Sequence, residues 1–268
     1  MVVTAEPTGI SLAGNRSTSI ELPFGVAQFD HIMKDGSFEA LNASFPPSDS
    51  RWYKAQGLDS KISIDSSHAA FDAVAGASQT WLQFLKGLKT FGFWNMVATT
   101  IYPIMRRNRE AGLLASQWPA NVRAAIDQPD GFAQFIRHST KPYFELSYLY
   151  PGDMNSPHSD DWKKLVSMIV YFPPENWRAD YGGGTVFLQA KTDLASRPWY
   201  KETMNRVPVA DSKAFFADME PFFRAEYQRN SCVVFCKTNN SFHAVEPIKC
   251  PPGLARRAFV LGLKLLDA

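Results

Sequence analysis

Three residues in the second half of the chain have the side chains and the spacing of a metal site. His158 and Asp160 are two residues apart and directly follow an aromatic segment that is typical of a strand. In extended backbone such residues project from one face, so this imidazole and this carboxylate can bind a common ion. A third ligand is needed, and His243, after another apolar segment, is well placed to supply it. Because His-x-Asp is common by chance, a capping Asp160 beside a surface His158 is the alternative.

Two imidazoles and one carboxylate on one side of a metal keep coordination positions open for other molecules, as in non-haem iron(II) oxygenases. His31, His68 and His138 have no partner at ligand spacing, so we expect structural or surface roles for them. Cys232 and Cys236 would point to one face of an apolar strand. Buried thiols are favoured over zinc ligands there, because no second Cys or His pair has suitable spacing.

The composition is that of a globular protein, and it narrows the classes of partner. Of the 268 residues, 45% are hydrophobic and 20% are charged, which suits a single domain with a large core. The net charge of +2, from 28 basic and 26 acidic residues, argues against nucleic acid as the main partner. The sequence has no segment typical of a signal peptide or a membrane span. We therefore expect one cytoplasmic domain over 1–268 without a membrane or nucleic-acid partner; the oligomeric state stays open.

The elements that must position these ligands change in character along the chain. Residues 1–140 are predicted to be a mainly helical support region, with Trp81 on the apolar face of a helix that begins near Ser78. Residues 141–268 contain short apolar runs separated by turn residues, which predict an α+β, β-rich fold with a β-sandwich or barrel. Helices are expected at 37–45 and 93–105, and strands at 24–30, 143–150, 164–172, 184–189, 231–236 and 256–266.

One segment, 191–227, does not fit this strand pattern. It contains several aromatic residues with weak periodicity, among them Trp199, Tyr200, Phe215 and Phe216. We interpret it as an insertion that either covers the mouth of the site or packs on the surface.

Four stretches of the second half recur together in a known family, in the same order. They are Tyr150-Pro-Gly-Asp, His158-Ser-Asp160, Tyr171-Phe-Pro followed by Tyr181-Gly-Gly-Gly-Thr-Val-Phe187, and His243-Ala-Val-Glu-Pro followed by Gly253-Leu-Ala-Arg-Arg-Ala258. In these stretches the chain resembles the 2-oxoglutarate- and iron(II)-dependent oxygenases, in the branch similar to prolyl 4-hydroxylases. The resemblance implies a double-stranded β-helix, a variant of the jelly roll, with N-terminal helices packed against it.

The resemblance also implies roles for individual residues. His158, Asp160 and His243 would hold iron, and Arg256 would bind the distal carboxylate of 2-oxoglutarate, because a guanidinium matches the two oxygens of a carboxylate. Arg257 is the alternative, since adjacent strand residues face opposite sides. The two tyrosines of the motifs, Tyr150 and Tyr171, stand where the family often directs hydroxyl groups toward the cosubstrate; ordinary strand aromatics are the alternative interpretation.

Two features depart from the family pattern. Gly184 stands where the family usually has Glu, so no role is transferred to that position. His243 and Arg256 are separated by more residues than usual, and Cys250-Pro-Pro-Gly253 is the apparent insertion.

The activity implied by the resemblance is hydroxylation of a C–H bond with dioxygen, coupled to decarboxylation of 2-oxoglutarate to succinate. A small organic metabolite of amino-acid, sugar or natural-product type is the expected substrate. A peptidyl substrate is one alternative. A cupin-like metal enzyme that does not use 2-oxoglutarate and a non-catalytic jelly-roll binding module are the others.

Overall fold

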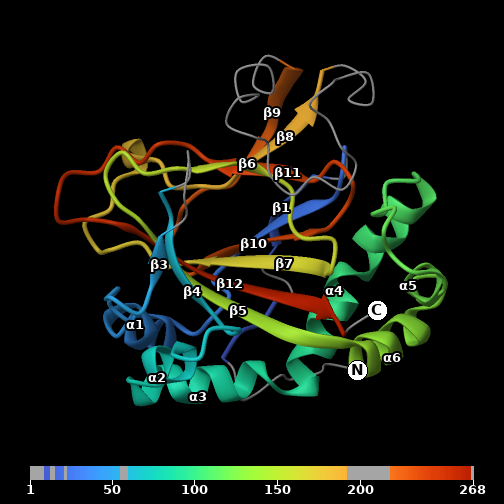
Figure 1. The fold of residues 1–268 in the computed structure, drawn as a ribbon, viewed down its shortest axis with the longest axis horizontal. Helices are drawn as coiled ribbons and strands as arrows, with labels where there is room; N and C mark the ends of the chain where they lie inside the picture. Colours follow the sequence, from blue (N-terminus) through green and yellow to red (C-terminus); the bar gives the residue numbers. More distant parts are fainter. Residues whose placement is uncertain (1–8, 13–15, 21–22, 55–59, 192–217, 267–268) are drawn as a thin grey trace.

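The computed structural model consists of two antiparallel sheets with helices against one of them (Figure 1). It describes residues 9–12, 16–20, 23–54, 60–191 and 218–266. In Figure 1 the helices lie below and beside the larger sheet, and the smaller sheet lies above it.

The larger sheet has eight strands in the order β1-β2-β10-β7-β12-β5-β4-β3. Its four central strands are the longer apolar runs of the second half of the chain, and they bury nearly every residue. The strands of this sheet are β1 Arg16–Ile20, β2 Val26–Asp30, β3 Tyr53–Lys54, β4 Ile62–Asp65, β5 Thr140–Leu149, β7 Lys164–Tyr171, β10 Ser231–Cys236 and β12 Arg256–Leu265.

The smaller sheet has four strands in the order β6-β11-β8-β9. They are β6 Asn155–His158, β8 Val186–Ala190, β9 Met219–Arg224 and β11 Phe242–Val245. From β5 to β12 the chain repeatedly crosses between the two sheets, and all pairings are antiparallel. Eight such strands in two facing sheets form a jelly roll, so the predicted α+β fold with a double-stranded β-helix core is confirmed.

The helices pack on the outer face of the larger sheet. Because side chains alternate along a strand, β10 directs Cys232 and Cys236 to this helical side and Phe235 to the space between the sheets. Trp81 is fully buried in the helical layer and donates a hydrogen bond from Nε1 to the Leu41 carbonyl (3.1 Å). The helices are α1 Asp35–Ala43, α2 Phe71–Ala75, α3 Gln79–Leu88, α4 Phe91–Glu110, α5 Ala120–Ala125 and α6 Pro129–Ser139, with one 3-10 turn at Ala179–Tyr181. Within the described ranges no helix is long and apolar enough to cross a membrane.

Two parts of the structure differ from the sequence prediction. Besides the predicted strand at 24–30, which is β2, the first 140 residues supply β1, β3 and β4 at the two edges of the larger sheet. The predicted insertion 191–227 includes β9, which was not predicted as a strand and which pairs with β8 in the smaller sheet. Its residues 192–217, with the four aromatic residues named above, lie outside the described residues.

Candidate metal centre

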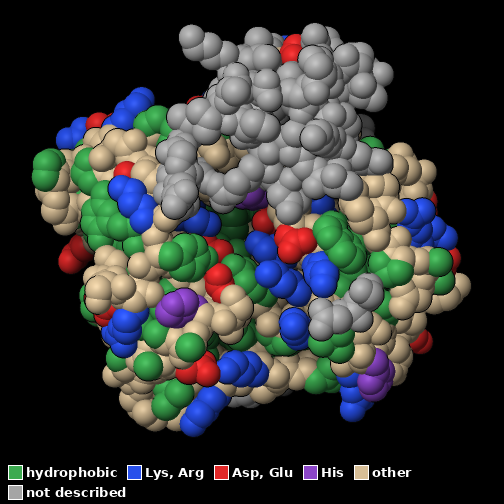
Figure 2. Space-filling model, viewed as in Figure 1, with side chains coloured by type: hydrophobic (Ala, Val, Ile, Leu, Met, Phe, Trp, Pro, Cys, Tyr) green, Lys and Arg blue, Asp and Glu red, His purple; other side chains and the backbone are tan. Residues whose placement is uncertain are grey.

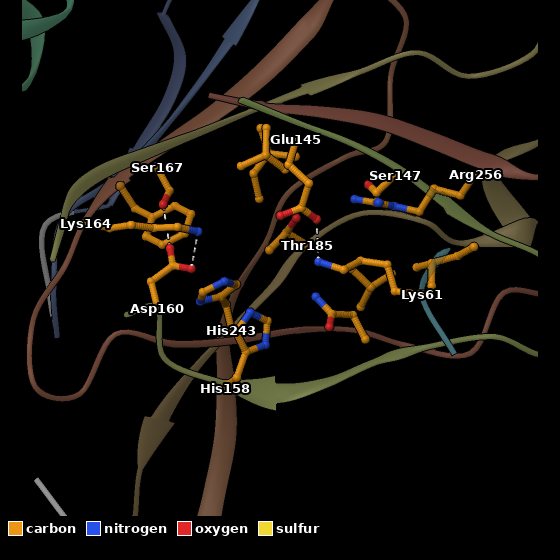
Figure 3. Close-up of a pocket in the computed structure, with 16 residues that line it drawn as sticks. Lys61, Glu145, Ser147, His158, Asp160, Lys164, Ser167, Thr185, His243 and Arg256 are labelled. Atoms are coloured by element: carbon orange, nitrogen blue, oxygen red, sulfur yellow. Dashed lines mark hydrogen bonds and ion pairs between the residues drawn. The ribbon is translucent and has the colours of Figure 1, made fainter. Parts of the chain in front are cut away.

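The smaller sheet brings the three predicted ligands together. β6 and β11 pair so that His158 lies opposite His243, and the two ring centroids are 4.3 Å apart. Asp160 lies two residues after the end of β6. The ligand atoms of the three side chains all lie within 4.8 Å of one another, and all three residues are at most 9% exposed (Figure 3). Among the described residues, no other three or more His, Cys, Asp or Glu side chains meet this criterion.

Both histidines are oriented by backbone carbonyls. His158 Nδ1 lies 2.8 Å from the Ser156 carbonyl, and His243 Nδ1 lies 3.1 Å from the Ser241 carbonyl. A carbonyl can only accept, so each Nδ1 carries the proton and each Nε2 keeps its lone pair for a metal. Burial, and then the nearby His243, lowers the pKa of His158 to about 3; burial also lowers the pKa of His243. Both rings are therefore neutral near pH 7, which is the form that binds metal.

Asp160 accepts a hydrogen bond on each carboxylate oxygen. Lys164 Nζ donates to Oδ1 (2.8 Å) and Ser167 Oγ donates to Oδ2 (2.5 Å). Burial alone would raise the pKa of Asp160, but the positive charge of Lys164, the two histidines and the hydrogen bond from Lys164 together outweigh burial and keep this pKa below its usual value. The carboxylate is therefore ionised.

A second lysine supports the middle of the His-x-Asp motif. Lys237, just after β10, donates from Nζ to the hydroxyl of Ser159, and both residues are buried. Burial lowers the pKa of Lys237 to about 8. Sequence reasoning missed Lys164 and Lys237; the only available signal was Lys164 four residues after Asp160.

A pocket that is partly open to solvent lies between the sheets beside these ligands, with a cavity volume of about 50 Å³. The face of the molecule seen in Figure 2 is hollowed near its centre, and basic and acidic side chains stand side by side there. Arg256 lines the pocket, away from the two histidines in Figure 3, and is only 3% exposed. Its Nε donates to the Gly183 carbonyl (2.6 Å), and its guanidinium lies over the rings of Tyr171 and Tyr227.

The neighbouring Arg257 faces the opposite side of β12, as alternation along the strand requires. Its guanidinium donates to the Phe172 carbonyl (3.0 Å) and to Asn42 Oδ1 (2.8 Å), next to α1. Of the two candidate arginines, only Arg256 therefore lines the pocket.

The two candidate tyrosines have different surroundings. The Tyr171 hydroxyl donates to Thr185 Oγ1 (2.8 Å), and Thr185 lines the pocket with Tyr171 behind it. Tyr150 is not among the lining residues, because β5 directs Leu149 inward; the Tyr150 hydroxyl instead shares a hydrogen bond with Ser48 (2.7 Å).

Sequence reasoning also missed an ion pair in the pocket. Glu145 of β5 accepts from Lys61 Nζ (2.6 Å) on Oε1 and from the Tyr143 hydroxyl (2.8 Å) on Oε2. The signal for Glu145 was a carboxylate at an inward position of an aromatic strand. Lys61, just before β4, had no such signal.

Gly184, where the family pattern has Glu, lies against the chain that follows β9. A Cβ at this position would lie 1.8 Å from the Ala225 carbonyl oxygen, so the side chain is excluded by the backbone.

Comparisons with known proteins match this chain in structure only. No family model and no curated protein matches the sequence. A prolyl-4-hydroxylase from Pseudomonas putida matches with 15% identity and a TM-score of 0.42, covering 90% of this chain and 93% of its own. A Trichoplax adhaerens prolyl hydroxylase, in complex with a hypoxia-inducible factor peptide, matches with 10% identity and a TM-score of 0.46, covering 89% and 83%.

A third match is SnoK, a non-haem α-ketoglutarate-dependent carbocyclase from nogalamycin biosynthesis, with 8% identity, a TM-score of 0.41 and coverage of 89% and 78%. Identities and TM-scores of this size do not support a function. The functional assignment therefore rests on the side chains of the site.

Proposed function

We propose that this protein is an oxygenase that uses Fe(II), 2-oxoglutarate and dioxygen to hydroxylate a C–H bond of a small organic metabolite. The observation that carries the proposal is the pairing of two features in one pocket. One is the buried triad of His158, Asp160 and His243, and the other is the buried guanidinium of Arg256, which has no carboxylate partner among the described residues.

The triad fits a divalent metal. Two neutral imidazoles and one ionised carboxylate converge within 4.8 Å. This is the donor set of the two-histidine, one-carboxylate facial site, which favours iron(II) and keeps positions open. The chemistry such a centre supplies is the oxidation of 2-oxoglutarate by dioxygen to succinate and carbon dioxide, with one oxygen atom delivered to the substrate.

Arg256 supports 2-oxoglutarate as the cosubstrate. The Gly183 carbonyl uses its Nε, so the two terminal nitrogens keep their donors for a carboxylate. The rings of Tyr171 and Tyr227 hold the guanidinium plane in place. The hydroxyl groups of Ser147 and Thr185 line the same pocket. A dicarboxylate would thus extend from Arg256 toward the metal ligands.

The test is the conversion of 2-oxoglutarate to succinate by purified protein after addition of Fe(II), followed by NMR, together with calorimetric titration of metal and of 2-oxoglutarate. We expect both to bind and slow turnover to occur without a prime substrate. His158→Ala should abolish metal binding, whereas the matched variant His138→Ala on α6 should retain it. Metal binding without 2-oxoglutarate binding would identify a different metal enzyme, and binding of neither would identify a non-catalytic module; either result refutes the proposal.

A further inference from the structure

The ion pair between Lys61 and Glu145 lies inside the pocket and is separate from the metal triad. The distance from Lys61 Nζ to Glu145 Oε1 is 2.6 Å, and the two side chains are 17% and 7% exposed. Figure 3 shows the pair between the two histidines and Arg256 in that view. Removing two charges from water costs about as much as their attraction returns, so a pair in this position is weak evidence for a role in stability. A role in binding a ligand explains the position of this ion pair in the pocket better than a role in stability.

The groups around this pair have hydrogen-bonding capacity that the described residues do not use. An ammonium group has three donors, and Lys61 uses one of them within the described part of the chain, toward Glu145. Each oxygen of Glu145 accepts one bond and has a second lone pair. Asn155 lines the same pocket, and its Oδ1 is buried without a partner among the described residues. The pocket therefore offers donors to a carboxylate and acceptors to an ammonium group.

The charges in the pocket define which ligand fits both halves of the pair. The positive charge of Lys61 offsets the negative charge of Glu145, and the charge of Lys164 offsets that of Asp160. In the oxygenase proposed above, the divalent metal and the dicarboxylate cosubstrate also cancel, and the remaining positive charge is that of Arg256, which binds the cosubstrate. The charges that a substrate meets beside the pair are therefore those of Lys61 and Glu145. A purely anionic ligand would place a negative charge beside Glu145, and a purely cationic ligand would place a positive charge beside Lys61. A ligand with one group of each sign satisfies both residues.

We propose that the prime substrate is a small zwitterion with an α-amino-acid head group. Its carboxylate binds Lys61, and its ammonium group binds Glu145 and the amide oxygen of Asn155. This inference rests on the proposed function, because it assigns the substrate class of that same pocket. Lys61 and Glu145 are then residues that determine specificity.

The experiment uses full-length protein loaded with Mn(II), which replaces iron and permits binding to be measured without turnover. Calorimetry first measures the binding of 2-oxoglutarate; failure at this step refutes the oxygenase assignment and not merely the substrate class. The 2-oxoglutarate complex is then titrated with the twenty proteinogenic L-amino acids. Each is compared with its deaminated acid and its decarboxylated amine. We expect at least one amino acid to bind about 10- to 100-fold more tightly than both analogues, since each analogue loses one charge-assisted contact.

Two substitutions then test the residues. Lys61→Met should remove the preference for the amino acid over the amine, and Glu145→Gln should remove the preference over the deaminated acid. Lys86→Met, on the exposed side of α3, is the control and should change neither preference. The wild-type comparison is independent of how well the variants fold. The inference is overturned if no amino acid binds, if a singly charged analogue binds equally well, or if Lys61→Met weakens 2-oxoglutarate binding instead.

Discussion

Replacement of Arg256 by Leu provides the sharpest test of the proposed cosubstrate site. In the structure the Nε of Arg256 is used by the Gly183 carbonyl, so two terminal nitrogens remain for a carboxylate. A hydrogen bond to a charged group contributes about 1.5–3 kcal/mol, and two of them contribute about 3–6 kcal/mol. The lower figure corresponds to a change of more than 100-fold in affinity. Arg256→Leu should therefore raise the KM for 2-oxoglutarate at least 100-fold. Arg256→Lys, which keeps one point contact, should raise it about 10-fold.

The adjacent Arg257 provides a matched control for this prediction. It lies on the same strand but contacts Asn42 and the Phe172 carbonyl on the helical side of the sheet. Arg257→Leu should lower the free energy of unfolding by about 1–3 kcal/mol, because it leaves buried acceptors without a donor. It should leave the KM for 2-oxoglutarate unchanged.

The assay is the initial rate of succinate formation against 2-oxoglutarate concentration, with a calorimetric Kd for 2-oxoglutarate on the Mn(II)-loaded protein as an independent readout. Thermal unfolding of each variant separates loss of the site from loss of the fold. The reasoning is refuted if Arg256→Leu keeps a KM within about threefold of wild type, or if Arg257→Leu raises the KM as much as Arg256→Leu does.

Two further predictions concern pH and packing. In EDTA the native state keeps His158 neutral down to its pKa of about 3, whereas the unfolded chain protonates this residue near pH 6.5. The unfolded state thus binds more protons between these values, so this residue should lower the free energy of unfolding by about 1.4 kcal/mol per pH unit as the pH falls. In urea unfolding at pH 7 and pH 5, the free energy of unfolding should drop less in His158→Gln than in wild type. Equal drops in the two proteins would contradict the assignment. Gly184→Ala places a Cβ 1.8 Å from the Ala225 carbonyl oxygen and should lower the free energy of unfolding by about 1–3 kcal/mol. The control is Gly92→Ala on α4, where a Cβ meets open space and should cost no stability. Equal denaturant midpoints for the two variants would exclude the clash.

The sequence predicted the larger sheet better than the smaller one, for a physical reason. Strands such as β10 and β12 are long and apolar because they are buried on both faces, so composition alone reveals them. β6 and β11 have four residues each, and β6 contains Pro157 and a candidate ligand. Strands this short, which also carry polar candidate ligands, show no hydrophobic periodicity in the sequence. β9 was missed because the apparent insertion concealed it.

Sequence reasoning indicated which side chains lie close together where spacing along the chain decides, and it missed neighbours where pairing in space decides. His158 and Asp160 are close in sequence, and the alternation on β12 allows only one of two arginines to face inward. Lys61 reaches Glu145 because β4 adds to the edge of the sheet beside β5, which no local pattern reveals. The same limit applies to Tyr150, because its direction depends on which residues of β5 face the pocket. The pairing of β5 directs Leu149 into the pocket, and Tyr150 therefore points elsewhere.

The metal triad depends on the register between β6 and β11. His158 and His243 are opposite each other, so a slip of one residue would turn one ring away from the other. The turn before β11 opposes such a slip: Ser241 accepts from the Thr238 backbone N–H on its hydroxyl (3.1 Å) and orients His243 with its carbonyl. Ser241 thus fixes both the start of β11 and the tautomer of His243. Independently, Lys164 at the start of β7 and Lys237 just after β10 hold the His-x-Asp segment by hydrogen bonds to Asp160 and Ser159. The candidate centre is therefore preorganised by contacts that reach it from both sheets, which is what positioning a cosubstrate and a substrate at open metal positions requires.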